Sequence, residues 1–297
     1  MTAATFDPCL PAATRDLTEP TSQDLAQSIR REYVDYAGGL ATSFALQGSG
    51  EPLLCLHGFD SSCFEFRRLL PQLAAHTEVR ALDCLGFGFT ERRLDLDYSP
   101  EAIRAHLYAC WRQWYRQPIL LAGASMGGAV AIDFALHYPE AVKGLVLLDG
   151  AGVPPGPVPG KFLISPLDRW AVAFLRREDV RRSVSVRAYH RPEVFVTPDA
   201  ELCAALHLQC PAWDEVLRRF TRSGGYGSYR HRLGELRCPT LVLWGRQDRI
   251  LGTKDAGVFE RELPNARLVW IEEAGHVPHL EQPQATAIAI REWLQDL

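Results

Sequence analysis

The chain has 297 residues, 47% of them hydrophobic, which is enough to bury the core of one large domain or of a domain with an insertion. Its 32 basic and 36 acidic residues give a net charge of −4, so charge offers no basis for binding a nucleic acid. No stretch approaches the roughly 18 apolar residues of a membrane span, and no basic start followed by an apolar run predicts a secretory signal. The eight cysteines form no C-x-x-C pair, which favours reduced thiols in a cytoplasmic protein.

Residues 1–30 are predicted to be an N-terminal lead-in that ends in a short helix beginning near Ser22. Two alternating segments within 33–47 surround a pair of glycines, which indicates an antiparallel hairpin. Continuous apolar runs then alternate with helical patterns, which favours a parallel sheet covered by helices on both faces. The strands are expected over 52–56, 79–83, 119–121, 144–148, 240–244 and 266–271. The helices are expected over 61–75, 99–116, from 126 onward and over 284–297.

The interval from Asp149 to Pro239 breaks this alternation. It is too long for a loop, it contains helical patterns of its own, and a Pro- and Gly-rich segment marks its start. We therefore predict a helical cap over 151–236, inserted into a core made of 31–150 and 237–297.

The junction between the third central strand and its helix carries the strongest chemical signal. Residues 123–127 read GASMG and fit Gly-x-Ser-x-Gly, in which a serine sits at a sharp strand-to-helix turn with its hydroxyl exposed. Small residues two positions before and after let the neighbouring backbone pass without a Cβ clash. We predict that Ser125 is a nucleophile; the alternative is a serine that only caps the helix.

A base and an acid are expected where other parallel strands end, because active groups in such sheets gather at the carboxyl ends of strands. Asp248 follows the strand at 240–244 and His276 follows the last strand, which gives the chain order serine, acid, histidine. In this scheme His276 takes the Ser125 proton and Asp248 orients the imidazole. Asp149 also ends a strand and is the alternative acid.

Two backbone amides are predicted to stabilise the oxyanion of a tetrahedral intermediate. One is the N–H of Met126, directly after the serine, and the other is the N–H of Phe59, which follows the His57-Gly58 turn. We expect His57 to shape the loop. The scheme requires no metal and no organic cofactor.

These motifs together resemble the α/β-hydrolase superfamily. The resemblance implies an α/β fold: a mostly parallel central sheet with helices on both faces and an inserted helical cap. Relatives with a carboxylate nucleophile are disfavoured, because Ser125 occupies the turn. The motifs that carry the resemblance are HG-x-x-x-S at 57–62, the turn at 83–90, GASMG at 123–127, WG-x-x-D at 244–248 and GH at 275–276.

A narrower resemblance points to the chlorophyll dephytylases and their cyanobacterial relatives. It is carried by HGFDSSC with EFRR over 57–68, AIDF at 131–134, and CPAW at 210–213 with SGGY at 223–226. The resemblance implies cleavage of the phytyl ester of chlorophyll or a related pigment, at the periphery of a thylakoid membrane.

The cap is expected to set specificity. Its aromatic residues could bind a hydrophobic substrate, and we predict that Phe162, Trp170, Trp213 and Tyr226 do so. A run of arginines at 176, 177, 181 and 182 could meet anionic lipid headgroups in a peripheral membrane contact through the cap. The alternative is ordinary packing of the cap on the core, with a solvated basic face.

The sequence thus predicts a serine hydrolase that cleaves a carboxylic ester of a bulky hydrophobic substrate through an acyl-enzyme, with chlorophyll as one candidate. A general carboxylesterase, a carbon–carbon bond hydrolase and a non-catalytic ligand receptor on the same fold are the alternatives.

Overall fold

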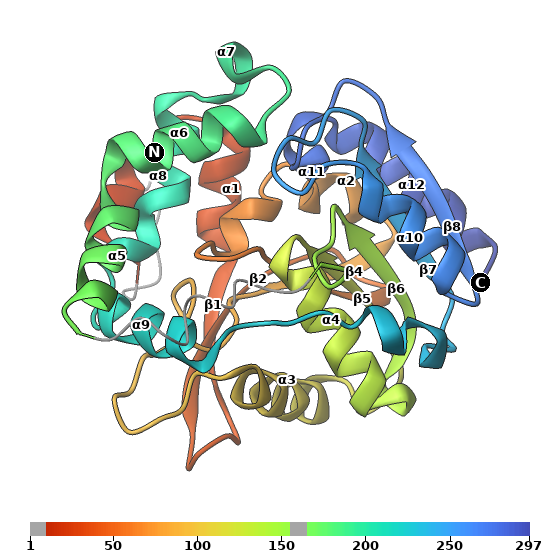
Figure 1. Ribbon diagram of the computed structural model, residues 1–297, viewed down its shortest axis with the longest axis horizontal. Coiled ribbons are helices and arrows are strands. Elements are labelled where there is room, and N and C mark those ends of the chain that lie inside the picture. Colours follow the sequence, from red (N-terminus) through yellow and green to blue (C-terminus); the bar gives the residue numbers. More distant parts are fainter. Residues whose placement is uncertain (1–9, 155–164) are drawn as a thin grey trace.

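The computed structural model describes residues 10–154 and 165–297, and these form an eight-stranded sheet in the order β1-β2-β4-β3-β5-β6-β7-β8 (Figure 1). The predicted α/β-hydrolase fold, mostly parallel with an inserted group of helices, is confirmed. The strands are β1 Ile29–Val34, β2 Leu40–Gln47, β3 Glu51–Leu56, β4 Thr77–Leu82, β5 Ile119–Ala124, β6 Val142–Leu148, β7 Thr240–Gly245 and β8 Ala266–Ile271.

The strand directions follow the sequence patterns. The hairpin of β1 and β2 is antiparallel, β2 also pairs antiparallel with β4, and the remaining neighbours are parallel. The central strands are buried on both faces, which explains why they read as continuous apolar runs. Because the carboxyl ends of β3, β5, β6, β7 and β8 lie at one edge, the loops that follow them can share a site.

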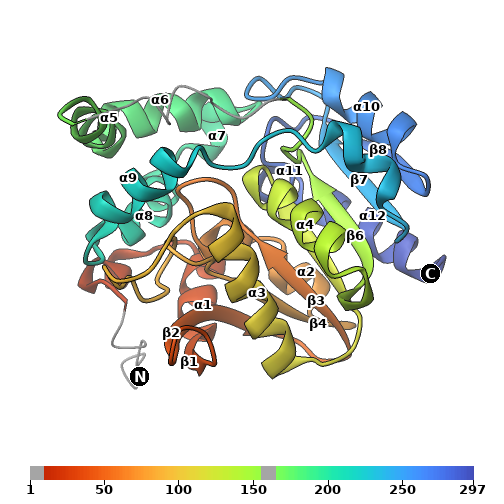
Figure 2. The ribbon, with the colours of Figure 1, turned by 60° about the horizontal axis from the view of Figure 1, so that its bottom comes forward.

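Helices cover both faces of the sheet (Figure 2). One face packs against α3, α4 and α10, and the other against α1, α2 and α12. Alternation along β3 serves both faces, since Leu54 and Leu56 join the first cluster while Leu53 and Cys55 join the second. These helices are α1 Pro20–Ser28, α2 Leu70–Leu73, α3 Pro100–Trp114, α4 Met126–His137, α10 Lys254–Glu262 and α12 Pro283–Gln295; the short α11 Pro278–Glu281 precedes α12.

The helix expected over 61–75 is broken in the structure. Ser62 caps a 3-10 turn, η2 Cys63–Phe66, by accepting a hydrogen bond from the Phe64 amide, and α2 begins only at Leu70. Pro71 lies in the first turn of α2, where its missing N–H costs nothing because no residue of the helix would accept that N–H. In the middle of a longer helix the same proline would remove a backbone hydrogen bond, so the predicted helix is interrupted here. Because of this break, Glu65 lies on the short turn η2 and not within a longer helix.

In the described part of the chain between β6 and β7, five α-helices form the insertion, above the carboxyl ends of the strands (Figure 2). They are α5 Leu167–Arg176, α6 Glu178–Ala188, α7 Pro192–Phe195, α8 Pro198–Ala205 and α9 Trp213–Ser223, with a 3-10 turn, η5 Leu206–Gln209, before α9. Among the described residues, no helix combines the length and the hydropathy needed to cross a bilayer.

Candidate active site

Ser125 lies at a strained turn between β5 and α4. Its φ of 51° and ψ of −117° fall outside the regions that a serine ordinarily adopts. A Cβ on Gly123 would collide with the carbonyl oxygen of Gly127, and one on Gly127 would collide with the carbonyl oxygen of Leu56. Both glycines are therefore needed for the close approach. The Ser125 side chain accepts no hydrogen bond from α4, so the structure does not support a purely capping role.

His276 and Asp248 form a buried pair on the loops after β8 and β7. The imidazole Nδ1 lies 3.0 Å from Oδ2 of Asp248. The other carboxylate oxygen accepts the amides of Ile250 at 2.7 Å and Leu251 at 3.2 Å. Burial alone would raise the pKa of Asp248, but its bond to His276 and these amides lower it below the usual value. The carboxylate is thus ionised at neutral pH and can hold a proton on Nδ1.

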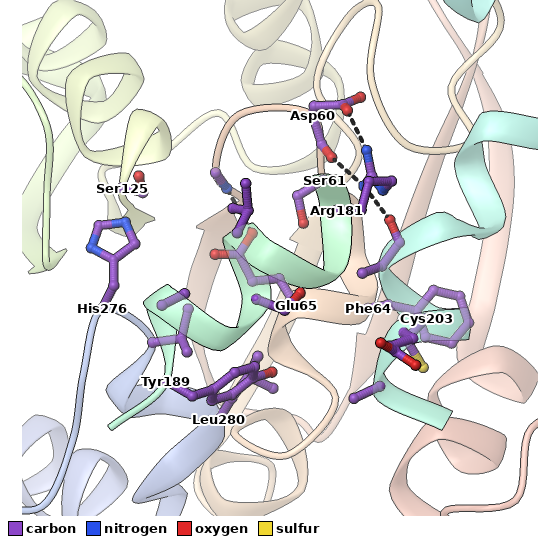
Figure 3. Close-up of a pocket in the computed structure, with 18 of the residues that line it drawn as sticks. Asp60, Ser61, Phe64, Glu65, Ser125, Arg181, Tyr189, Cys203, His276 and Leu280 are labelled. Carbon is purple, nitrogen blue, oxygen red and sulfur yellow. Dashed lines mark hydrogen bonds and ion pairs between the residues drawn. The ribbon is translucent and has the colours of Figure 1, made fainter. Parts of the chain in front are cut away.

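The serine and the histidine line one cavity. Figure 3 shows the His276 ring directly beside the Ser125 hydroxyl, with a ring nitrogen turned toward it. Within the described residues no hydrogen bond joins the two side chains. Catalytic hydrogen bonds are often long before substrate binds, so this geometry is compatible with proton transfer from serine to imidazole.

Asp149, the alternative acid, lies close to this pair. It is fully buried, and its two oxygens face the Gly245 amide at 3.0 and 3.2 Å. Burial, followed by the nearby negative charge of Asp248, raises the pKa of Asp149 well above its usual value. No hydrogen bond from His276 to Asp149 is found in the described part of the chain. The geometry therefore assigns the imidazole to Asp248.

Ligand atoms of Asp149, Asp248 and His276 lie within 4.8 Å of one another, the spacing of a metal site. Asp248 is already engaged by the imidazole and by two amides, and Asp149 by a third amide. A metal ion would have to compete with these bonds, so the donor set suits an acid–histidine pair better than a metal centre.

Met126 directly follows the serine and Phe59 lines the same cavity, and in the described residues neither backbone amide donates a hydrogen bond to another residue. His57 accepts the Cys84 amide through Nε2, at 3.2 Å, so its Nδ1 carries the proton that is donated to the Gly58 carbonyl at 2.8 Å. Both nitrogens of His57 are used in holding the loop, which makes it a structural histidine. Both amides thus lack an acceptor within the described part of the chain, as the predicted role of oxyanion donors requires.

The cavity has a volume of about 340 Å³ and runs from the serine to the space between the core and the insertion. Glu65 projects into it and accepts the Gly58 amide at 2.8 Å. The sequence did not identify Glu65, or any residue of α6 and α8, as part of the lining of this cavity. The apolar part of the lining includes Phe64, Leu175, Val180, Val184, Val196 and Leu280.

Three of the four aromatic residues predicted to bind substrate are described, and they lie outside the lining of this cavity. Trp170 is 67% exposed on α5, while Trp213 and Tyr226 are buried and are not in the lining of this cavity. The indole of Trp213 instead donates to Asp60 at 2.8 Å. Phe162 lies outside the described residues.

A sheet of this order, with a serine at a strained turn and a histidine–carboxylate pair at the same edge, defines an α/β-hydrolase. Residues 53–289 match the Alpha/beta hydrolase family, and the chain belongs to that family.

Relatives of this chain include lipases and esterases. The chain is 31% identical to the alpha/beta hydrolase domain-containing protein VTE7 of Arabidopsis thaliana, over 94% of this chain and 87% of that protein. It is 28% identical to Lipase 1 of Psychrobacter immobilis, over 80% of this chain and 75% of the lipase. The structure of a thermophilic esterase from Thermogutta terrifontis superimposes with a TM-score of 0.77 at 28% identity, covering 90% of this chain and 98% of the esterase.

Proposed function

We propose that this α/β-hydrolase is a serine esterase that acts through an acyl-enzyme. Ser125 attacks the ester carbonyl, His276 accepts the serine proton, and Asp248 holds the imidazole tautomer and stabilises the imidazolium. The single observation that carries the proposal is the strained Ser125 facing the same cavity as a histidine that is bonded to an ionised carboxylate.

The remaining steps follow from the same atoms. The amides of Phe59 and Met126 bind the oxyanion of the tetrahedral intermediate, a contribution of about 3 kcal/mol for each donor. His276 then returns its proton to the leaving alcohol, and the acyl group stays on Ser125. Water, activated by the same imidazole, releases the acid. Ester cleavage needs no cofactor in this scheme.

The substrate that we propose is a bulky hydrophobic ester. The lining of the cavity is mainly aliphatic, which suits a hydrocarbon chain. A volume of about 340 Å³ suits one arm of such an ester, so the rest of a large substrate would lie at the mouth under the cap. The phytyl ester of chlorophyll fits this description, and the motifs over 57–68 support it. A general carboxylesterase and a carbon–carbon bond hydrolase remain the alternative reactions.

The reaction class and the substrate can be tested together. We expect a fluorophosphonate probe to label the wild-type protein, which would distinguish an enzyme from a non-catalytic receptor. Chlorophyll in detergent should then yield chlorophyllide and phytol, measured by chromatography. Turnover of short p-nitrophenyl esters without chlorophyllide would reject the pigment substrate while leaving the esterase reaction intact.

A membrane contact through α5 would bring such a substrate to the site. Leu167, Trp170 and Phe174 lie on one face of α5 and are 50%, 67% and 55% exposed. Arg169 and Arg177 are exposed beside them, so the face suits an anionic lipid surface.

We expect the wild-type protein to sediment with vesicles that contain phosphatidylglycerol. The double change Trp170→Ala and Phe174→Ala should weaken that binding about tenfold, because two interfacial aromatic residues are lost. Ile288, an exposed hydrophobic residue on α12, provides the control: Ile288→Ala should bind like the wild type. An equal loss of vesicle binding in the double variant and in Ile288→Ala, or no vesicle binding by the wild type, would contradict this membrane contact.

A further inference from the structure

One carboxylate in the oxyanion loop is bound by three parts of the insertion. Asp60 accepts hydrogen bonds from Arg181 on α6 at 2.7 Å, from Trp213 on α9 at 2.8 Å, and from Nε2 of His207 on η5 at 3.0 Å. Figure 3 shows Arg181 reaching across from α6 to Asp60 at the top of the cavity. We call these four side chains the Asp60 latch.

The latch is buried, and both carboxylate oxygens of Asp60 accept hydrogen bonds, while Nε of Arg181 and Nδ1 of His207 have no hydrogen-bond partner among the described residues. Asp60 is 8% exposed and His207 is fully buried, so an unpaired charge there would be strongly unfavourable. Burial alone would raise the pKa of Asp60, but His207, Arg181 and Trp213 lower it to about 2. Arg181 also donates to the Ala204 carbonyl at 2.6 Å, which fixes the guanidinium against α8. These bonds thus keep the Asp60 carboxylate ionised and fix its position between the core and the insertion.

The position of Asp60 connects this network to the chemistry. Asp60 directly follows Phe59, and its φ of 49° is a left-handed conformation that the surrounding bonds must hold in place. On the other side of Phe59, the Gly58 amide donates to Glu65 at 2.8 Å. The Phe59 amide therefore lies between Gly58, which is hydrogen-bonded to the buried carboxylate of Glu65 in the core, and Asp60, whose own buried carboxylate is hydrogen-bonded to the insertion.

We propose that Asp60 is a positioning residue, and that the Asp60 latch sets the orientation of the Phe59 amide and makes the oxyanion hole depend on the placement of the cap. The inference rests on the proposed esterase function. Val180 and Val184, on the same helix as Arg181, line the cavity. A substrate that fits against α6 leaves the hydrogen bonds of the Asp60 latch intact. A substrate that displaces α6 moves the Phe59 amide away from the oxyanion. The rate of the reaction therefore depends on how well the substrate fits under the cap.

The test removes the donors of one latch side chain at a time and keeps most of that side chain's bulk. Trp213→Phe deletes the indole N–H and keeps an aromatic ring, and Arg181→Met deletes the charge. Each should lower kcat for a soluble short ester about tenfold or more, with KM within about threefold, because a misdirected oxyanion donor weakens the transition state and not ground-state binding. Affinity for a boronic acid, whose adduct with Ser125 carries an oxyanion, should fall in parallel. Active sites titrated with a fluorophosphonate give kcat per competent site, so loss of folded protein does not imitate the effect.

Arg182 provides the matched control. It is on the same helix, but it pairs with Glu201 of α8 at 2.6 Å near the surface, and so stays within the insertion. Arg182→Met should keep kcat per titrated site within about twofold of the wild type, as expected for an exposed ion pair. If Arg181→Met and Trp213→Phe behave like this control, the positioning role is refuted.

A wild-type protein that takes no label would refute the esterase function instead. In that case, the Asp60 latch is tested by measuring hydrogen exchange of the backbone amides of residues 57–61. Exchange should rise in Arg181→Met and remain unchanged in Arg182→Met; equal exchange in both variants would refute the latch.

Discussion

Replacing Ser125 by alanine is expected to lower esterase turnover by about 10⁴-fold to 10⁶-fold, since loss of the nucleophile disables the whole serine–histidine–acid unit. The hydroxyl is the atom that forms the acyl-enzyme, and His276 cannot activate a methyl group. A small residual rate should persist because the oxyanion amides and the cavity still bind the transition state. Covalent labelling by a fluorophosphonate should disappear entirely.

Ser185 offers a matched control for this change. It is a serine on α6 that lines the same cavity. Ser185→Ala should retain turnover within about threefold, as surface and lining substitutions away from the reacting atoms usually do. Both proteins should unfold at nearly the same temperature as the wild type. Substantial turnover in Ser125→Ala would mean that another group carries the reaction.

The placement of Ser125 could be predicted because it is a local property of the chain. Five consecutive residues contain both the strained serine and the glycines that avoid contact with neighbouring backbone. Asp248 and His276 could be located for a related reason, since parallel strands end at a common edge and the residues after each strand can be read off the sequence. The core strands were predicted by the same apolar runs that the structure buries on both faces.

The insertion was less predictable because its contacts are distant in sequence. Arg181 was read as part of a basic face, but it is bound to Asp60, 121 residues away. Trp213 was predicted to touch substrate because it is large and aromatic, whereas its N–H is used by the same carboxylate. Helical periodicity shows which face of α9 is apolar, not which polar atom across the fold will meet its indole. Placement of α6 over the cavity likewise depends on packing between elements.

The choice of acid is a second case in which sequence left two candidates open. Asp149 and Asp248 each follow a strand, and their oxygens lie near one imidazole. The difference is in protonation. Asp248 is held ionised, mainly by His276 and two loop amides, against the effect of burial. Burial and the charge of Asp248 raise the pKa of Asp149 well above its usual value, which favours the neutral form of that carboxyl.

Asp248→Asn is therefore expected to reduce kcat by about 10⁴-fold, the scale seen when a triad acid is replaced by its amide. The amides of Ile250 and Leu251 require an acceptor, so the asparagine oxygen will face them and its NH₂ will face Nδ1 of His276. An imidazole that accepts at Nδ1 carries its proton on Nε2 and cannot take the proton of Ser125. Asp149→Asn should cost less than about tenfold, because an amide has the shape of the neutral acid and its oxygen can still accept the Gly245 amide. Steady-state kinetics per titrated site would compare the two variants, and a severe Asp149→Asn beside a mild Asp248→Asn would exchange their roles.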